Sequence, residues 1–357
     1  MFARCATGES RERRKRAVRV AFDTRPASDP HGLGRYARCL LGALHDTASA
    51  SDEMVDTHRP SVVARSRGAD VFHSPWLTGA MLHSPCPTVV TIHGLAALKR
   101  RSEHLRTGLR LRLRHLAVQR AACVIVPTQA VAEDAVTHLR LERERIVVIP
   151  EAADAAMYPR PAHEVEAVRH RFGLPERYLV WVGGLQHPDP ARHVAELAAA
   201  PRDLPLVLVG STRPWAHELP GVTLTGRVSD EHLAAIYSGA HALVLPSEGE
   251  GFGLPAVEAL ACGTPVVAFA SPALLEVLGG RAQFVPPGDM EALIEAAQAA
   301  RRPAPTPASW TWEDAARATW GVYTRALAPT GEAHGSDAPL RRRTIANAQR
   351  IDGCEPQ

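Results

Sequence analysis

The sequence predicts an α/β protein made of two parallel-sheet units. Short runs rich in β-branched residues alternate with longer helical patterns, which is typical of parallel α/β construction. The alternation breaks near Tyr158 and restarts at Tyr178. A length of 357 residues suits two domains better than one core. Two such units facing each other leave a cleft, and ligands of open parallel sheets bind beyond the carboxyl ends of the strands.

Each unit is expected to contain five strands. Those of the first unit are Val18–Phe22, Val71–His73, Thr88–Ile92, Cys123–Val126 and Ile146–Ile149, with helices at Ala37–Leu44 and Leu105–Ala122. Those of the second unit lie in the segments YLVWVGG from Tyr178, PLVLVGS, VTLTG, HALVLPS and PVVAFA. The polar interval from Asp46 to Gly68 predicts no clear strand.

These patterns give domain boundaries. We expect a first domain over residues 17–165 and a second over 173–305. A last helical pattern at residues 311–328 is expected to return to the first domain. Residues 1–16 form a basic arm, and the polar, aperiodic residues 329–357 are predicted to be a disordered tail.

The composition is that of a soluble globular protein. Hydrophobic residues make up 45% and charged residues 22%, and the net charge is +3. Six scattered cysteines show no CxxC pair and no metal-type spacing, which favours a reducing cytosol. No apolar run reaches membrane-spanning length, so we expect a cytoplasmic protein. We also expect no nucleic-acid partner. The arginine-rich stretch at residues 99–120 indicates either a solvated helix or peripheral contact with an anionic membrane.

The strongest motif is SEGEGFGLPAVEALACGTPVV, from Ser247 to Val267. A buried strand is followed by a loop with three glycines, and Pro255 marks the first turn of a helix. Amides of Gly251, Phe252, Gly253 and Leu254 can approach a ligand there, and a helix amino terminus favours the charge of a diphosphate.

Two carboxylates flank this loop. Glu250 could accept hydrogen bonds from sugar hydroxyls, and Glu258 could hold the two hydroxyls of a ribose. Either glutamate alone is as readily explained by the helix dipole. The whole string, with its tight return through Gly263 to another strand, favours a binding site.

This segment resembles the E-x7-E signature of the retaining glycosyltransferases of family 4, whose fold is of the two-domain GT-B type. The resemblance covers most of Val18 to Leu327. It implies transfer of a hexose, mannose or glucose, from a nucleotide diphosphate sugar to a hydroxyl acceptor with the anomeric configuration kept. The acceptor stays open among glycans, lipid-linked molecules and small molecules.

The resemblance carries over to residues of the first unit. His93, at the end of the strand TVVTIH, matches the family histidine that contacts a donor hydroxyl, although the family usually has aspartate where Gly94 stands. A histidine bonded at a strand end is the structural alternative. Gly34, in GLGRY, matches the glycine loop that approaches the donor phosphates.

Further positions match in the second unit. Gly183 and Gly184 leave room for the phosphates, and Arg192 is the nearest candidate for the basic residue that neutralises them. Asp189 would stand there in an ungapped match, and a solvated arginine is the alternative reading of Arg192. The loop with Arg227 and Val228 resembles the one whose backbone meets the nucleobase.

Neither a metal nor another cofactor is expected besides the nucleotide sugar co-substrate. The chain has no DxD motif, and GT-B enzymes generally stabilise the leaving diphosphate with positive groups and helix dipoles.

Two other function classes stay open. GLGRYA also fits a weak dinucleotide fingerprint and so a nicotinamide oxidoreductase, although Asp23 to His31 separate it from its strand. The other class is a non-catalytic GT-B relative that acts as a partner protein. This class is favoured by the interval from Asp46 to Gly68, which predicts no clear strand, and by Gly94. It is opposed by the intact His93, Glu250 and Glu258.

Overall fold

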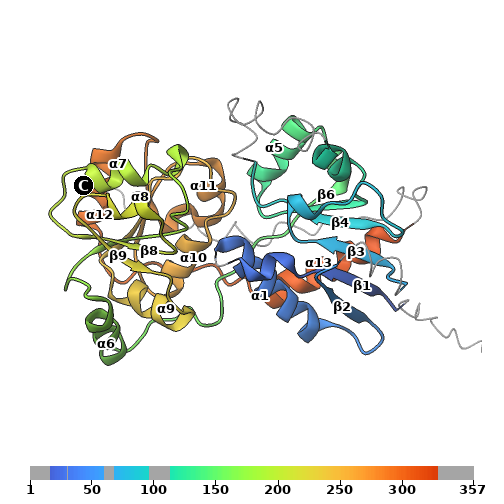
Figure 1. Cartoon of the computed structure of the whole chain (residues 1–357), viewed down its shortest axis with the longest axis horizontal. Coiled ribbons are helices and arrows are strands. Elements are labelled where there is room, and N and C mark those ends of the chain that lie inside the picture. The colour runs from blue at the N-terminus through green and yellow to red at the C-terminus, as the bar shows by residue number, and fades with distance from the viewer. Residues whose placement is uncertain (1–16, 30, 60–67, 96–112, 329–357) are drawn as a thin grey trace, which may run out of the picture. The chain divides into compact units, whose positions relative to one another are not determined.

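The computed structural model describes residues 17–29, 31–59, 68–95 and 113–328 (Figure 1). Within them, twelve strands form two six-stranded sheets in which all neighbouring strands are parallel. The described residues up to Leu327 form one compact unit. The predicted α/β fold with two parallel sheets is therefore confirmed.

The first sheet has the order β2-β1-β3-β4-β5-β6. Its strands are β1 (Arg19–Asp23), β2 (Glu53–Thr57), β3 (Val71–Ser74), β4 (Thr88–Thr91), β5 (Cys123–Val126) and β6 (Ile146–Val148). The helices that go with it are α1 (Gly32–Thr47), α5 (Gln129–Leu139), a helical stretch at residues 113–119, α13 (Trp312–Ala326) and the short turns η1 (Arg25–Ser28), η2 (Leu77–Gly79) and η3 (Arg143–Arg145).

The second sheet has the order β12-β11-β10-β7-β8-β9. Its strands are β7 (Leu179–Val182), β8 (Leu206–Val209), β9 (Val222–Gly226), β10 (Ala242–Leu245), β11 (Val266–Phe269) and β12 (Gln283–Val285). The helices around it are α6 (Ala162–Phe172), α7 (Val194–Ala199), α8 (Pro214–His217), α9 (Asp230–Gly239), α10 (Leu254–Ala261), α11 (Pro272–Leu278) and α12 (Met290–Ala299), with short turns η4 (Pro190–Arg192) and η5 (Gly279–Arg281).

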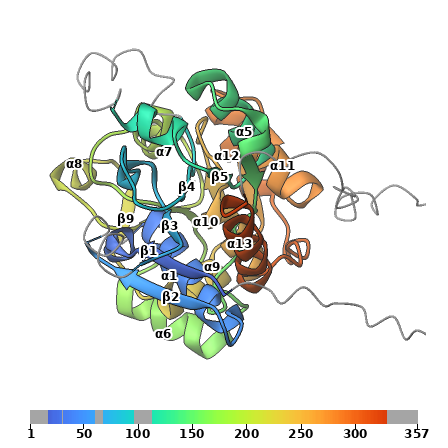
Figure 2. The ribbon, with the colours of Figure 1, turned by 90° about the vertical axis from the view of Figure 1, so that its right-hand side faces the viewer.

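Helix α13 joins the core of the first sheet, although it is last in the chain. Its Trp312 and Tyr323 are buried in one cluster with Phe22 and Leu40. Figure 2 shows α13, in dark red, among the elements of the first sheet. Thr311 begins the helix with a capping box, in which its side chain accepts from the N–H of Asp314. Apolar residues at helical spacing thus bring residues 312–326 back to the sheet.

The second sheet is buried on both faces, which explains its nearly continuous apolar strands. Alternate residues of β7 show this, since Val180 packs with α9 and α10 while Leu179 and Trp181 pack with α12. No helix among the described residues is long and apolar enough to span a bilayer.

Three expectations need comment. The interval from Asp46 to Gly68 does contain a strand, β2, which pairs with β1 over its whole length, so the prediction of no strand was wrong. The strand is short and half exposed at a sheet edge, so it carries little apolar signal. The helix expected at Ala37–Leu44 is longer and begins at Gly32. The helix expected at Leu105–Ala122 lies partly outside the described residues, as does most of the basic stretch.

Candidate functional site

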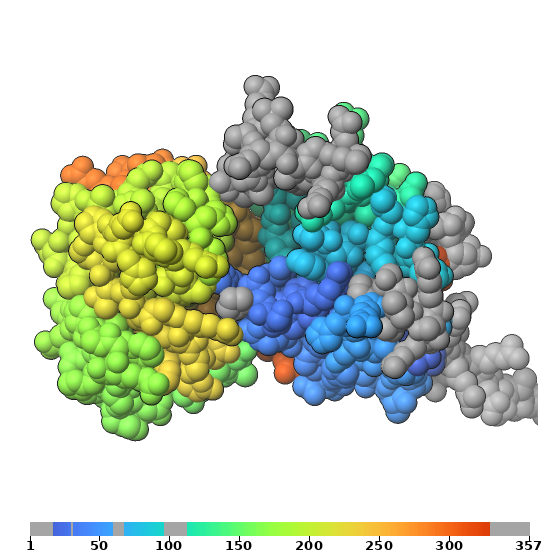
Figure 3. Space-filling view, in the orientation of Figure 1, coloured from blue at the N-terminus to red at the C-terminus, as the bar shows by residue number. Residues whose placement is uncertain are grey.

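One cavity of about 940 Å³ collects most of the predicted site residues. Its wall includes the start of α1, the end of β4, the turns after β7 and β9, and the loop into α10. The space-filling view shows the surface hollowed beside the blue start of α1 (Figure 3). Because these are carboxyl ends of strands and amino ends of helices, backbone N–H groups and loop side chains face the cavity, as in open parallel sheets.

The loop from Glu250 to Leu254 forms one side of this cavity. Gly253 caps α10 with φ 87°, a left-handed conformation that favours glycine. A Cβ at Gly251 would lie 1.6 Å from the carbonyl oxygen of His93, so the loop can approach His93 only with glycine there. The Gly251 carbonyl also accepts a hydrogen bond from the Thr128 hydroxyl at 3.0 Å. The glycine-rich loop therefore lies directly against the end of β4.

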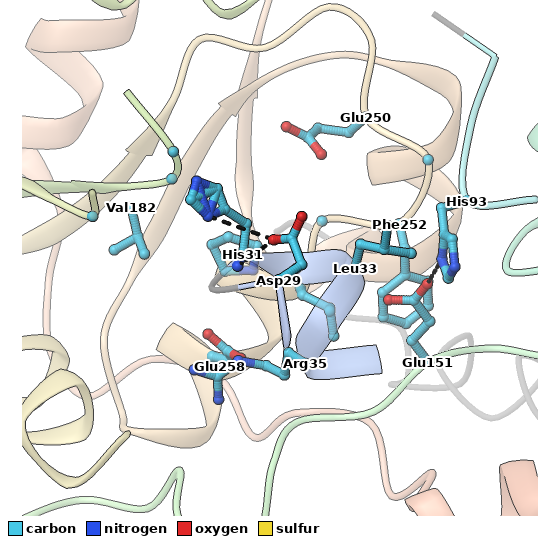
Figure 4. A pocket seen from close by; sticks show the side chains of 18 of the residues that line it. Asp29, His31, Leu33, Arg35, His93, Glu151, Val182, Glu250, Phe252 and Glu258 are labelled. Atoms are coloured by element: carbon cyan, nitrogen blue, oxygen red, sulfur yellow. Dashed lines mark hydrogen bonds and ion pairs between the residues drawn. The ribbon is translucent and has the colours of Figure 1, made fainter. Parts of the chain in front are cut away.

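Glu258 is a buried carboxylate at this site, with only 2% of its surface exposed. The hydroxyl of Tyr237 donates to its Oε2 at 3.2 Å, and Nε of Arg35 lies 3.0 Å from its Oε1. Burial raises the pKa of Glu258 to about 7, while the charge of Arg35 and the Tyr237 hydrogen bond oppose that rise. Figure 4 shows Arg35 and Glu258 side by side.

His93 is held by oxygen acceptors on both ring nitrogens. Nδ1 lies 2.8 Å from Oε1 of Glu151 (Figure 4). Nε2 donates to the carbonyl of Pro75 at 2.9 Å. The ring of Tyr36 packs edge-on against the imidazole, with centroids 4.3 Å apart. The Glu151 side chain is 4% exposed, so its buried carboxylate holds the ring in one orientation.

Gly183 and Gly184 follow β7 and line the cavity, as the sequence predicted. A Cβ at Gly184 would lie 2.2 Å from the ring of His31, so this glycine lets His31 approach closely. The His31 ring reaches the Ser211 hydroxyl at 3.0 Å and lies 3.6 Å from the Asp29 carboxylate. His31 thus lies at the place where the sequence predicted donor phosphates.

The remaining predicted side chains also line the cavity. Arg192, at the end of η4, is 42% exposed and lies 3.7 Å from Asp189. Arg227 and Val228 follow β9. Among the described residues, the Glu250 carboxylate has no hydrogen-bond or ion-pair partner, so both of its oxygens are available to a ligand.

Gly34 is the predicted site residue that is not part of the cavity wall. It lies within the first turn of α1, and a Cβ there would be 1.9 Å from the carbonyl oxygen of Asp29. The close packing of helix and preceding turn therefore explains this glycine, and its neighbours Gly32 and Leu33 line the cavity instead. The helix also begins well after β1 ends at Asp23, unlike a dinucleotide fingerprint.

Among the cavity residues that were not predicted from the sequence, His31, Arg35 and Glu151 carry ionisable side chains next to predicted positions. His31 and Arg35 flank the glycines of GLGRY, so this motif was the only local sequence feature that could have pointed to these two residues. Glu151 follows β6 and meets His93 from 58 positions away.

Comparison with known proteins identifies the family. The model of "Glycosyltransferase Family 4" matches residues 8–156, and that of "Glycosyl transferases group 1" matches residues 176–301. The D-inositol 3-phosphate glycosyltransferase of Mycolicibacterium smegmatis is 30% identical over 332 residues, which are 80% of this chain and 72% of that protein. The 2-deoxystreptamine glucosyltransferase of Streptomyces kanamyceticus is 30% identical over 54% of this chain, and the match spans only 55% of its own length.

Solved structures share the fold. Sucrose-phosphate synthase of Thermosynechococcus elongatus superposes with a TM-score of 0.63 at 23% identity, over 87% of this chain and 94% of that one. The Anabaena protein Alr3699/HepE, solved in complex with UDP and glucose, gives 0.61 at 18% identity over 87% and 94%. Together with the two sheets and the cavity at their strand ends, these matches show that the chain belongs to glycosyltransferase family 4 and has the GT-B fold.

Proposed function

We propose that this chain is a retaining glycosyltransferase that moves a hexose from a nucleotide diphosphate sugar to a hydroxyl acceptor. The observation that carries the proposal is the position of Glu258. It is a buried carboxylate one turn into α10, behind a glycine-rich loop that opens on the cavity. An ionised carboxylate there can accept hydrogen bonds from both hydroxyls of a ribose.

The other groups suit the rest of such a donor. Gly183 and Gly184 with Arg192 would receive the diphosphate, together with the amino terminus of α10. The loop with Arg227 and Val228 would meet the base through its backbone. Glu250 and His93 lie near the start of the glycine-rich loop, where the hexose would be, and Glu250 would accept hydrogen bonds from the hexose hydroxyls.

The proposed reaction uses the donor's own phosphate as the base. The bond from the anomeric carbon to the diphosphate oxygen breaks, while the acceptor oxygen bonds to the same face of that carbon. The departing phosphate oxygen takes the acceptor proton, so the products are a nucleoside diphosphate and a glycoside of unchanged configuration. Positive groups and helix dipoles already oriented in the site stabilise the charge that develops on the diphosphate, with no metal ion required.

The relatives guide the choice of substrates. The names of two relatives contain 2-deoxystreptamine and D-inositol 3-phosphate. A third relative is named as an MMP alpha-(1->4)-mannosyltransferase, of Mycolicibacterium hassiacum. The structural neighbour in complex with UDP-glucose suggests a nucleotide sugar donor. We therefore propose glucose or mannose as the hexose.

The test is a panel of UDP-, GDP- and ADP-linked glucose and mannose, measured by thermal shift and by release of the nucleoside diphosphate. At least one donor should stabilise the protein and be consumed, in EDTA as well as without it, and proton NMR of the product should show the donor's anomeric configuration. Glu258→Ala should weaken donor binding by about 10-fold or more, since a bidentate charged contact is lost. If no donor stabilises the protein or is consumed, the proposal is wrong.

A further inference from the structure

A buried cation from the side of the first sheet contacts the carboxylate that we assign to ribose. Arg35 lies in the first turn of α1, and its side chain is 13% exposed. Its Nε lies 3.0 Å from Oε1 of Glu258 on α10, and its Nη2 donates to Oδ1 of Asp230 on α9 at 2.5 Å. A single guanidinium therefore joins α1 to two helices of the second sheet.

Without Arg35, Glu258 would be surrounded by apolar atoms and other negative groups. Burial raises its pKa to about 7, and the neighbouring Asp230 and Asp154 act in the same direction. Arg35 and the hydrogen bond from Tyr237 oppose this rise. The titratable groups that act on Glu258 or feel its charge are Arg35 and Cys39 of α1, Asp230 and Tyr237 of α9, Asp154 after β6, and Cys262 at the end of α10.

Arg35 is also the nearest cation to this carboxylate. Among the described residues, no other arginine, lysine or histidine forms an ion pair with Glu258. Nη1 of Arg35 is buried and has no hydrogen-bond partner in the described part of the chain, although the residue lines the cavity. Arg35 thus has one donor nitrogen that is unused, and Oε1 of Glu258 lies outside hydrogen-bond geometry. Together these groups form a site prepared for a ligand with neighbouring hydroxyls.

We infer that Arg35 is a positioning residue for nucleotide binding: it keeps Glu258 ionised and oriented for the ribose hydroxyls. This inference rests on the proposed function. A carboxylate can accept from two hydroxyls, whereas a protonated carboxyl has to donate with one of its oxygens. The role is distinct from phosphate binding, because it acts through Glu258 and therefore shows in the pH dependence of affinity.

The experiment measures the affinity for UDP, GDP and ADP by calorimetry between about pH 6 and 8.5, using the nucleotide that binds the wild type most tightly. In the wild type, affinity should rise as Glu258 ionises, around pH 7. In Arg35→Met the rise should move up by about one pH unit or more, so that binding is weaker by at least about 3-fold at pH 7.5 and by about 10-fold near pH 6, and recovers at higher pH. Arg35→Lys keeps a charge without the planar fork and should keep a midpoint close to that of the wild type.

A double-mutant cycle separates this role from a structural one. In the Glu258→Gln background, Arg35→Met should cost little further affinity and should leave the pH profile unchanged, because Arg35 acts through the carboxylate. Arg317→Met, on the exposed face of α13, is the matched control and should bind like the wild type. Circular dichroism checks that each variant folds.

The outcomes distinguish the two proposals. If the wild type binds none of the three nucleotides, the proposed function fails and this inference fails with it. If the wild type binds and Arg35→Met keeps the same pH midpoint, or if its effect adds fully to that of Glu258→Gln, only the inference about Arg35 is wrong. If Arg35→Met does not fold, the same cycle with Arg35→Gln, which also removes the charge but keeps a polar side chain, decides, since a role through Glu258 predicts no effect in the Glu258→Gln background.

Discussion

Glu258 lies in a helix whose other residues are apolar, since α10 reads LPAVEALA. A charged group in such a segment costs free energy unless it has partners, so Tyr237 and Arg35 are needed for the fold as well as for a ligand. Glu258 is therefore a charged residue in a helix whose other positions are all apolar, and such departures from the local pattern mark functional positions. The Glu151 carboxylate is a second example, buried beside His93.

At this scale we predict that Glu151→Gln disturbs catalysis through His93. The amide keeps the shape of the carboxylate and one oxygen acceptor but loses the charge, so the hydrogen bond that orients the His93 ring becomes weaker. We expect kcat/KM for the accepted donor to fall by about 10-fold or more, with a smaller change in the free energy of unfolding. Steady-state kinetics measure the first effect and denaturant unfolding the second, and the NMR chemical shifts of the His93 ring report on its hydrogen bond.

Glu166→Gln is the matched control, because Glu166 lies on the exposed side of α6 in a pair with Arg169. It should leave both the kinetics and the His93 signals unchanged. Unaltered kcat/KM together with unaltered chemical shifts of the His93 ring in Glu151→Gln would show that the carboxylate has no such role.

At the scale of elements, much of the fold follows from the sequence. Runs such as LVWV and ALVL can be recognised in the sequence as buried strands, because parallel strands covered on both faces are continuously apolar. Strands β2 and β12 were both missed, because EMVDT and QFV are edge strands with few buried positions. The local motif from Glu250 to Glu258 likewise predicted its own loop and helix, since Gly253, Pro255 and the flanking strand are adjacent in the chain.

The contacts between distant segments could not be predicted in this way. His93 meets Glu151 across 58 positions, and Arg35 meets Asp230 across 195. No periodicity or spacing encodes such a pair, because it depends on how complete elements pack. The position of Gly34 shows the same limit, since its packing against Asp29 depends on the turn η1, which the sequence did not indicate.

Helix α13 gives the prediction at this scale. Its Tyr323 shares a 2.6 Å hydrogen bond with Nδ1 of His73, which is buried in β3. Tyr323→Phe removes that partner and leaves a buried ring nitrogen unsatisfied, so the free energy of unfolding at about pH 7 should fall by about 1–3 kcal/mol. Denaturant unfolding followed by fluorescence measures it, and Arg317→Ala on the exposed face of α13 should change it by less than about 0.5 kcal/mol.

The same pair predicts a loss of stability in acid. Burial lowers the pKa of His73 from 6.5 to about 3. Between these values the unfolded chain binds a proton that the folded chain does not, so this contribution is complete above pH 6.5 and is lost as the pH falls toward 3. Wild-type stability that stays constant as the pH is lowered from about 6.5 to 5 would contradict the neutral, buried state of His73.

At the scale of the whole molecule, charged contacts connect the elements of the two sheets at separate places. Arg35 joins α1 to α9 and α10. Elsewhere, the carboxylate of Glu276 on α11 accepts from the backbone N–H groups of Gln129 and Ala130, at 2.7 and 3.0 Å. These two N–H groups begin α5, so the carboxylate also complements the positive end of that helix. Motion of one sheet relative to the other has to break both contacts.

Glu276→Ala tests whether the second contact forms in solution. The amides of Gln129 and Ala130 lose their acceptor, so we expect their hydrogen exchange to speed up by about 10-fold or more, while amides in β4 and β5 keep their protection. Glu295→Ala, an exposed position on α12, is the control and should change neither amide. Because the pair is at the surface, the free energy of unfolding should change by no more than about 1 kcal/mol. Unchanged exchange at both amides would mean that α11 and α5 are not held together through Glu276.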